Sequence, residues 1–203
     1  MEIEQPLKII GLGGNLGQSS RSLSVLKLAL KAAEQAGATT ELLDMSKLQL
    51  PFFVPGQPIE AYPEPEVIKV YLEKTSAADG FIWASPVYHG SMSAPFKNAL
   101  DLLELLPRRP RLYLEGKVVG MLAVAAGQIG APMTLTAMWQ VARALKVLVA
   151  PASLSISQGR QIFDSEGDLV DERIAGQVAV LGREVTELTR LYRQMPSTDD
   201  KRS

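Results

Sequence analysis

Apolar segments of two kinds alternate along the chain. Short, nearly continuous apolar runs that end in glycine or small polar residues are typical of buried parallel strands. Between them, apolar residues recur at the spacing of one helical face. The runs lie at residues 7–14, 39–45, 79–85, 117–127 and 147–156, and the helical patterns at 23–33, 64–77, 96–106, 135–145 and 174–188. Strand and helix therefore alternate along the whole chain.

This alternation predicts an α/β domain with a mostly parallel sheet. Right-handed crossovers restrict the topology, and we expect a flavodoxin-like, doubly wound five-stranded sheet of strand order 2-1-3-4-5. Residues 1–195 are expected to form a single domain, followed by a disordered tail at residues 196–203. The proline-rich stretch at residues 48–66 predicts an irregular loop.

Composition excludes several classes of site. The 203 residues include no cysteine and one histidine, which leaves no thiol chemistry and no expected metal site. A net charge of −1 gives no reason to expect nucleic acid or an anionic membrane surface as partner. With neither a signal peptide nor a transmembrane segment evident, we expect a cytoplasmic protein.

Three loops should meet at one crevice. In the predicted strand order, the first, third and fourth strands are neighbours, and ligands bind where their carboxyl ends lie. The loops that leave these strands are GGNLGQSSRS, SPVYHGSMSAP and AAGQIGAP. All three are rich in glycine, serine or other small residues, so this edge of the sheet is the candidate site.

The first loop suits a phosphate group. Its glycines allow close backbone approach, and Ser19, Ser20 and Ser22 lie at the start of a helix, whose N–H groups and dipole attract anions. The loop lacks GK[ST], so it is not a Walker loop. An ordinary capped turn between strand and helix would explain the same residues.

The same loop also supports a rival interpretation. Gly11, Gly13 and Gly17 approximate a dinucleotide-binding fingerprint, and Asp44 at the end of the second strand could bind a ribose. The spacing departs from G-x-G-x-x-G. A NADP-binding Rossmann reductase without flavin is the alternative that these residues leave open.

The second loop suits a flat ring system. Tyr88 could pack against the ring, and the backbone amides of His89 and Gly90 could face its polar edge. For the His89 side chain itself, a solvent-facing loop position is the favoured interpretation, and no acid–base role is assigned to it. In the third loop, Gly127 and Gln128 could pass beside the same ring.

The segment SPVYHGSMSAPFKNALDLL resembles the P-x-Y-[NH]-x-S…LKNALD segment of the NADPH-dependent FMN reductase family, which includes quinone, chromate and azo-dye reductases. The first loop partly resembles the family's G-S-L-R-x-x-S-x-S loop. The resemblance implies a flavodoxin-like fold, with FMN and NADPH as cofactors and no catalytic side chain or metal. The cofactor-binding positions that it implies are Gly14, Asn15, Leu16, Ser20, Arg21, Ser22, Pro86, Val87, Tyr88, His89, Gly90, Ser91, Gly127 and Gln128.

Some positions depart from the family pattern. Asn15 stands where serine is usual, Gly17 where arginine is usual, and Val87 where an acid is common. Arg21 is the nearby residue that could supply the missing positive charge. The resemblance implies a homodimer or homotetramer that passes reducing equivalents from NADPH through flavin to a quinone, free flavin or similar small-molecule acceptor. A flavodoxin-fold electron carrier without enzymatic activity is a further alternative.

Overall fold

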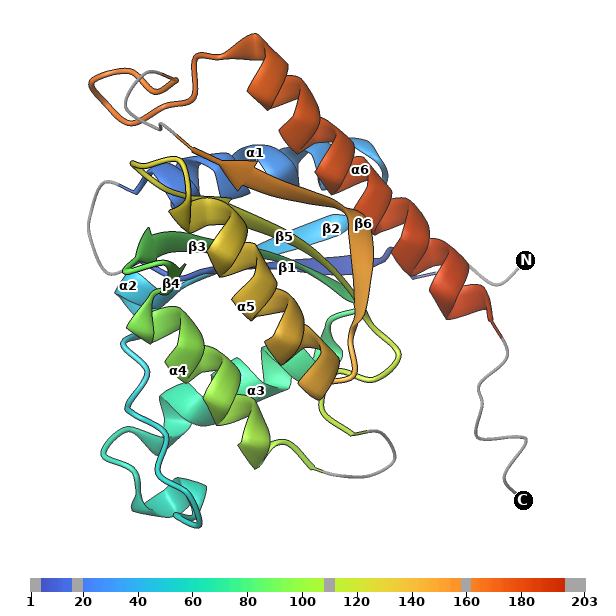
Figure 1. Cartoon of the computed structure of the whole chain (residues 1–203). Helices are drawn as coiled ribbons and strands as arrows, with labels where there is room; N and C mark the ends of the chain where they lie inside the picture. The colour runs from blue at the N-terminus through green and yellow to red at the C-terminus, as the bar shows by residue number, and fades with distance from the viewer. Residues whose placement is uncertain (1–4, 16–19, 108–111, 158–161, 196–203) are drawn as a thin grey trace.

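A computed structural model describes residues 5–15, 20–107, 112–157 and 162–195 (Figure 1). Five parallel strands form its sheet in the order β2-β1-β3-β5-β6. This is the predicted flavodoxin-like order, which is therefore confirmed. The strands are β1 (Lys8–Gly13), β2 (Thr39–Asp44), β3 (Gly80–Tyr88), β5 (Val118–Val124) and β6 (Leu148–Ile156).

A sixth strand corrects one prediction. The segment after Ser85 is expected from sequence to be a loop, but β3 continues through it to Tyr88 and pairs antiparallel with β4 (Ser91–Met92). His89 and Gly90 form the connection, with φ angles of 51° and 77°. Positive φ at both central residues is the requirement of a type I′ hairpin turn, whose twist matches that of the strands it joins. The segment expected to be a loop is thus a hairpin.

The helices form a layer on each face of the sheet. They are α1 (Arg21–Gln35), α2 (Met45–Leu48), α3 (Pro65–Ala77), α4 (Ala94–Leu102), α5 (Gly130–Ala144) and α6 (Glu172–Gln194). Helices α1 and α6 cover one face, and α3, α4 and α5 cover the other (Figure 1). Successive strand residues point to opposite faces, so Ile9 packs with α1 and α6 while Ile10 packs with the other layer.

The edge strand β6 accommodates a proline through an irregular register. Val119 pairs with Val149 but Met121 pairs with Ser153, so β6 carries extra residues around Pro151. Proline lacks the N–H needed within a ladder, and an edge strand with a bulge tolerates it. The displaced N–H of Ala152 donates to Glu184 Oε1 of α6 at 3.1 Å.

The proline-rich stretch at residues 48–66 is irregular, as predicted, apart from the end of α2, a short 3₁₀ turn at Ile59–Ala61 and the start of α3. Asn98 of α4 holds it by two hydrogen bonds, donating from Nδ2 to the Pro51 carbonyl at 3.0 Å and accepting at Oδ1 from the Phe53 N–H at 2.9 Å. Within the described ranges, no helix is both long and apolar enough to cross a membrane.

Candidate functional site

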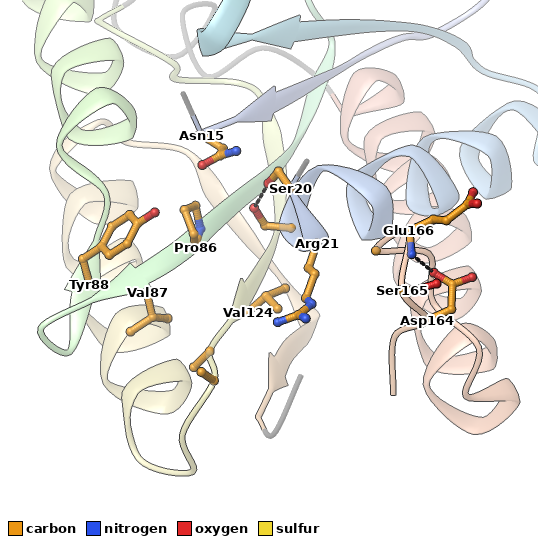
Figure 2. Close-up of a pocket in the computed structure, with 14 residues that line it drawn as sticks. Asn15, Ser20, Arg21, Pro86, Val87, Tyr88, Val124, Asp164, Ser165 and Glu166 are labelled. Carbon is orange, nitrogen blue, oxygen red and sulfur yellow. Dashed lines mark hydrogen bonds between the residues drawn. The ribbon is translucent and has the colours of Figure 1, made fainter. Parts of the chain in front are cut away.

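A cavity of about 440 Å³ opens at the carboxyl edge of the sheet, where ligands bind in such folds. Its volume is within the range of small-molecule sites. Five of the described segments line it (Figure 2). They are the residue Asn15 after β1, the start of α1, the end of β3, the exit of β5 and a turn after β6, contributing Asn15, Ser20, Arg21, Ser22, Pro86, Val87, Tyr88, Val124, Ala125, Ala126, Asp164, Ser165, Glu166 and Gly167.

The first turn of α1 forms one end of the cavity. Ser20 is the N-cap, and its Oγ accepts a hydrogen bond from the Leu23 N–H at 3.2 Å. The hydroxyl groups of Ser20 and Ser22 lie 2.9 Å apart. The helix has no acidic residue in its first turn. No carboxylate of the helix itself therefore competes for its N-terminal N–H groups and dipole, which favour a bound anion.

Arg21 places a positive charge at this helix terminus. A cation at the N-terminal end of a helix is disfavoured by the dipole, so the position does not serve the stability of the helix. The guanidinium lies over the ring of Phe163, 5.6 Å from its centroid, in a cation–π contact that holds it at the cavity. Helix and side chain together make this end of the cavity electropositive.

The opposite end is formed by the β3–β4 hairpin. Strands β3 and β5 pair as far as Pro86 and Val124, and beyond this pair β3 continues to Tyr88. Figure 2 shows the Tyr88 ring on one side of Pro86, with Ser20 and Arg21 on the other. The Tyr88 side chain is 56% exposed. An exposed aromatic ring beside a proline and the small residues Ala125 and Ala126 offers a surface on which a flat ring could lie.

The start of helix α5 packs against this hairpin. A Cβ added to Gly130, the first residue of α5, would lie 2.8 Å from Val87 Cγ1, so a larger residue at this position would displace the Val87 side chain. Val87 also packs against the small cluster of Ala123, Ala125 and Ala131. The hairpin is therefore held by packing as well as by its turn.

Half of the sequence-predicted positions line the cavity. These are Asn15, Ser20, Arg21, Ser22, Pro86, Val87 and Tyr88. Leu16 is outside the described residues. The predicted positions that the structure places away from the lining are Gly14, His89, Gly90, Ser91, Gly127 and Gln128.

Packing and position in the chain explain why these six predicted residues do not line the cavity. Gly14 is buried against Phe96, where an added Cβ would come within 2.4 Å of Phe96 Cβ. His89, Gly90 and Ser91 form the far end of the hairpin. In the third loop, Ala125 and Ala126 line the cavity, whereas Gly127 and the Gln128 side chain are exposed beyond it.

Sequence reasoning missed the acidic turn. Asp164, Ser165, Glu166 and Gly167 follow β6, which the predicted strand order places at the edge of the sheet rather than among its three central loops. The composition Asp-Ser-Glu-Gly signals a turn. No pattern in the sequence indicated that this turn reaches the start of α1.

The Rossmann alternative is not supported by the residues on which it depended. Gly11 and Gly13 lie inside β1, packed against leucines of α1, instead of forming the turn after the strand. Gly17 is outside the described residues. The Asp44 carboxylate caps α2, accepting from the N–H of Ser46 at 3.0 Å and from its hydroxyl at 2.8 Å.

Comparison with known proteins identifies the family of the chain. The family model described as NADPH-dependent FMN reductase matches residues 7–161. An NAD(P)H-dependent FMN reductase of Pseudomonas aeruginosa is 29% identical over 171 residues, covering 82% of this chain and 86% of that protein. An NADPH:quinone oxidoreductase of Arabidopsis thaliana is 29% identical over 178 residues, covering 84% and 85%.

A solved structure supports the fold. The flavoenzyme NAD(P)H:(acceptor) oxidoreductase from Paracoccus denitrificans superposes with a TM-score of 0.73 at 17% identity, covering 92% of this chain and 98% of that one. The chain therefore belongs to the NADPH-dependent FMN reductase family, whose members are flavin-dependent oxidoreductases.

Proposed function

We propose that the protein binds FMN in the cavity at the carboxyl edge of the sheet and reduces a small-molecule acceptor with NADPH. The single observation that carries this placement is the electropositive first turn of α1 facing Pro86 and Tyr88 across one cavity. A phosphate at one end and a flat ring at the other are the two chemical parts of FMN. The residues present therefore fit the group.

The electropositive end would hold the phosphate. The Arg21 guanidinium, the Ser20 and Ser22 hydroxyl groups and the N–H groups of the first turn of α1 would donate hydrogen bonds to its oxygens. Asn15 lies on the same wall, where the family more often has serine. Arg21 would supply the positive charge of the arginine that is usual in the family at the position of Gly17.

The hairpin end would hold the ring. Pro86 and Val87 would contact one part of it and the Tyr88 side chain would pack beside it, while Ala125 and Ala126 leave space for a planar group. When bound, FMN supplies the redox chemistry, accepting hydride from NADPH and passing the electrons to an acceptor. The chain need only orient the ring and keep one side accessible, so no acid–base side chain is assigned.

The acceptor is proposed to be a quinone, a free flavin or a similar small molecule. The irregular stretch at residues 48–66 carries exposed apolar side chains, among them Phe52 at 76% exposure, and could contribute to acceptor binding. We further propose a cytoplasmic homodimer or homotetramer. Exposed Ile129, Met133 and Trp139, on or beside α5, support an interface between copies. Light scattering on the purified protein would test the oligomeric state.

The decisive experiment is anaerobic. FMN and NADPH are added to the purified protein, and the visible absorption band of oxidised flavin is followed. We expect the band to bleach and to recover when a quinone is added. A yellow protein that NADPH does not reduce would support the electron-carrier alternative instead. A protein that binds NADPH but cannot be loaded with FMN would support the flavin-free reductase.

A further inference from the structure

A tight hairpin at residues 162–170 forms one wall of the cavity. The family model ends at residue 161, so this hairpin lies just beyond the part of the chain that the family model matches. Phe163 and Leu169 form an antiparallel bridge, and the Asp164 N–H donates to the Asp168 carbonyl at 3.0 Å. The residues at its tip, 164–167, line the cavity together with the first turn of α1. In Figure 2 the backbone of this turn lies on the side of Arg21, and the Glu166 side chain extends away from it.

The hairpin is fixed by its own turn. Asp164 Oδ1 accepts hydrogen bonds from the N–H groups of Glu166 and Asp168, each at 2.9 Å. Gly167 has a φ of 91°, a conformation that favours glycine. The carboxylate of Asp164 is thus occupied in holding the turn, while the exposed side chain of Glu166 has no part in these bonds.

Two contacts fasten the hairpin to α1. The Ser24 hydroxyl donates to Asp168 Oδ1 at 3.0 Å. Phe163 is only 6% exposed, packs in the core with α1 and α6, and carries the Arg21 guanidinium over its ring. The distance between the hairpin tip and the electropositive end of the cavity is therefore set by packed side chains.

The charges along this wall change sign over a short distance. Among the described residues that line the cavity, Arg21 is the cation and Asp164 and Glu166 are the carboxylates. One phosphate at the start of α1 would meet Arg21. A second phosphate joined to the first, if it extended along this wall, would come near the hairpin backbone and the negative charges of Asp164 and Glu166.

We propose that the 162–170 hairpin makes the flavin site selective for FMN over FAD. It closes the cavity beyond one phosphate and repels the diphosphate and adenosine that distinguish FAD. This inference rests on the proposed placement of the flavin phosphate at the start of α1.

The test measures dissociation constants of FMN and of FAD by isothermal titration calorimetry. Glu166→Gln removes one charge without touching the turn, and a second variant replaces residues 164–168 by Asn-Gly, the preferred two-residue hairpin turn. Glu172→Gln is the matched control, because Glu172 is exposed at the start of α6 and does not line the cavity. Thermal unfolding confirms that each variant is folded.

We expect the wild-type protein to bind FMN more tightly than FAD. The ratio of the two dissociation constants should shrink about fivefold in Glu166→Gln, equivalent to about 1 kcal/mol, and further in the shortened variant. The control should keep the wild-type ratio. Equal affinity of the wild-type protein for both flavins, or a ratio unchanged in both hairpin variants, overturns the inference and leaves the proposed function intact. Failure of the wild-type protein to bind FMN overturns both.

Discussion

The Ser93 hydroxyl donates a hydrogen bond to the carbonyl oxygen of Gly14, joining the start of α4 to the end of β1. The same hydroxyl caps α4, accepting from the Phe96 N–H at 3.4 Å, and the Ser93 N–H donates to Ser85 Oγ at 3.0 Å. Ser93 is 1% exposed. One buried serine thus connects the segments that lead into both ends of the cavity.

Replacing this serine should destabilise the fold. Ser93→Ala removes a helix cap and leaves the Gly14 carbonyl without this buried partner, so we expect a loss of about 2 kcal/mol in the free energy of unfolding. Urea denaturation followed by circular dichroism measures it. Ser91→Ala, at an exposed hydroxyl on the neighbouring hairpin, is the control and should change stability by less than about 0.5 kcal/mol. Equal effects of the two substitutions would contradict the connecting role.

His89 should act through its backbone conformation. Its φ of 51° suits asparagine but strains a β-branched side chain. We expect His89→Asn to retain wild-type stability and NADPH oxidation, and His89→Val to lose about 1–2 kcal/mol. Denaturation and steady-state assays separate the two effects. A folded His89→Asn protein that had lost activity would show that the imidazole itself takes part in the reaction.

Arg21 should contribute to the binding of the phosphate and not of the ring. We expect Arg21→Gln to weaken FMN binding about tenfold, the value of one charge-assisted hydrogen bond, and to leave the affinity for riboflavin nearly unchanged because riboflavin lacks the phosphate. Fluorescence titration with each flavin measures this. Arg143→Gln is the matched control, since Arg143 lies over Trp139 at 5.2 Å and is not part of the cavity. Parallel losses for both flavins would disprove the phosphate contact.

Two glycines of α6 should respond oppositely to alanine. A Cβ at Gly182 would lie 2.2 Å from the Ala29 carbonyl oxygen of α1, whereas a Cβ at Gly176 would meet nothing within 4 Å. We expect Gly182→Ala to destabilise the protein by about 2–3 kcal/mol through separation of α1 from α6. Gly176→Ala should stabilise it by about 0.5–1 kcal/mol, since alanine loses less backbone entropy in a helix. Chemical denaturation of the two variants would show the difference in sign.

Tyr71 should make the free energy of unfolding fall as the pH rises in the alkaline range. Burial raises the pKa of its phenol well above the usual value of 10.0, and the hydroxyl donates to the Ala99 carbonyl at 2.8 Å. Because the folded pKa is the higher one, this contribution is complete below about pH 10 and is lost as the pH rises further. Tyr71→Phe should cost about 1–2 kcal/mol at neutral pH, and its deficit should shrink above pH 10. Tyr88→Phe, at an exposed phenol, should keep the wild-type dependence on pH.

Local patterns in the sequence determined the order of the elements. The apolar run at β5 predicted a strand covered on both faces, and all seven of its residues are buried. Ser20 is among the serines that the sequence placed at the start of the first helix, and it is the N-cap of that helix. Such features depend on residues a few positions apart, so periodicity and capping chemistry report them directly. The strand order followed from the rules for connecting parallel strands.

Tertiary structure alone decided which residues share the cavity. The chain past Ser85 became a hairpin because β4 could pair with it, and in the third loop Ala125 and Ala126, not Gly127 and Gln128, reached the lining. The acidic turn meets α1 through Ser24 and Asp168, which are 144 positions apart. Contacts of this kind depend on how α1 and α6 pack against the sheet and each other. That packing is the sum of many distant side-chain contacts, and no local stretch of sequence contains it.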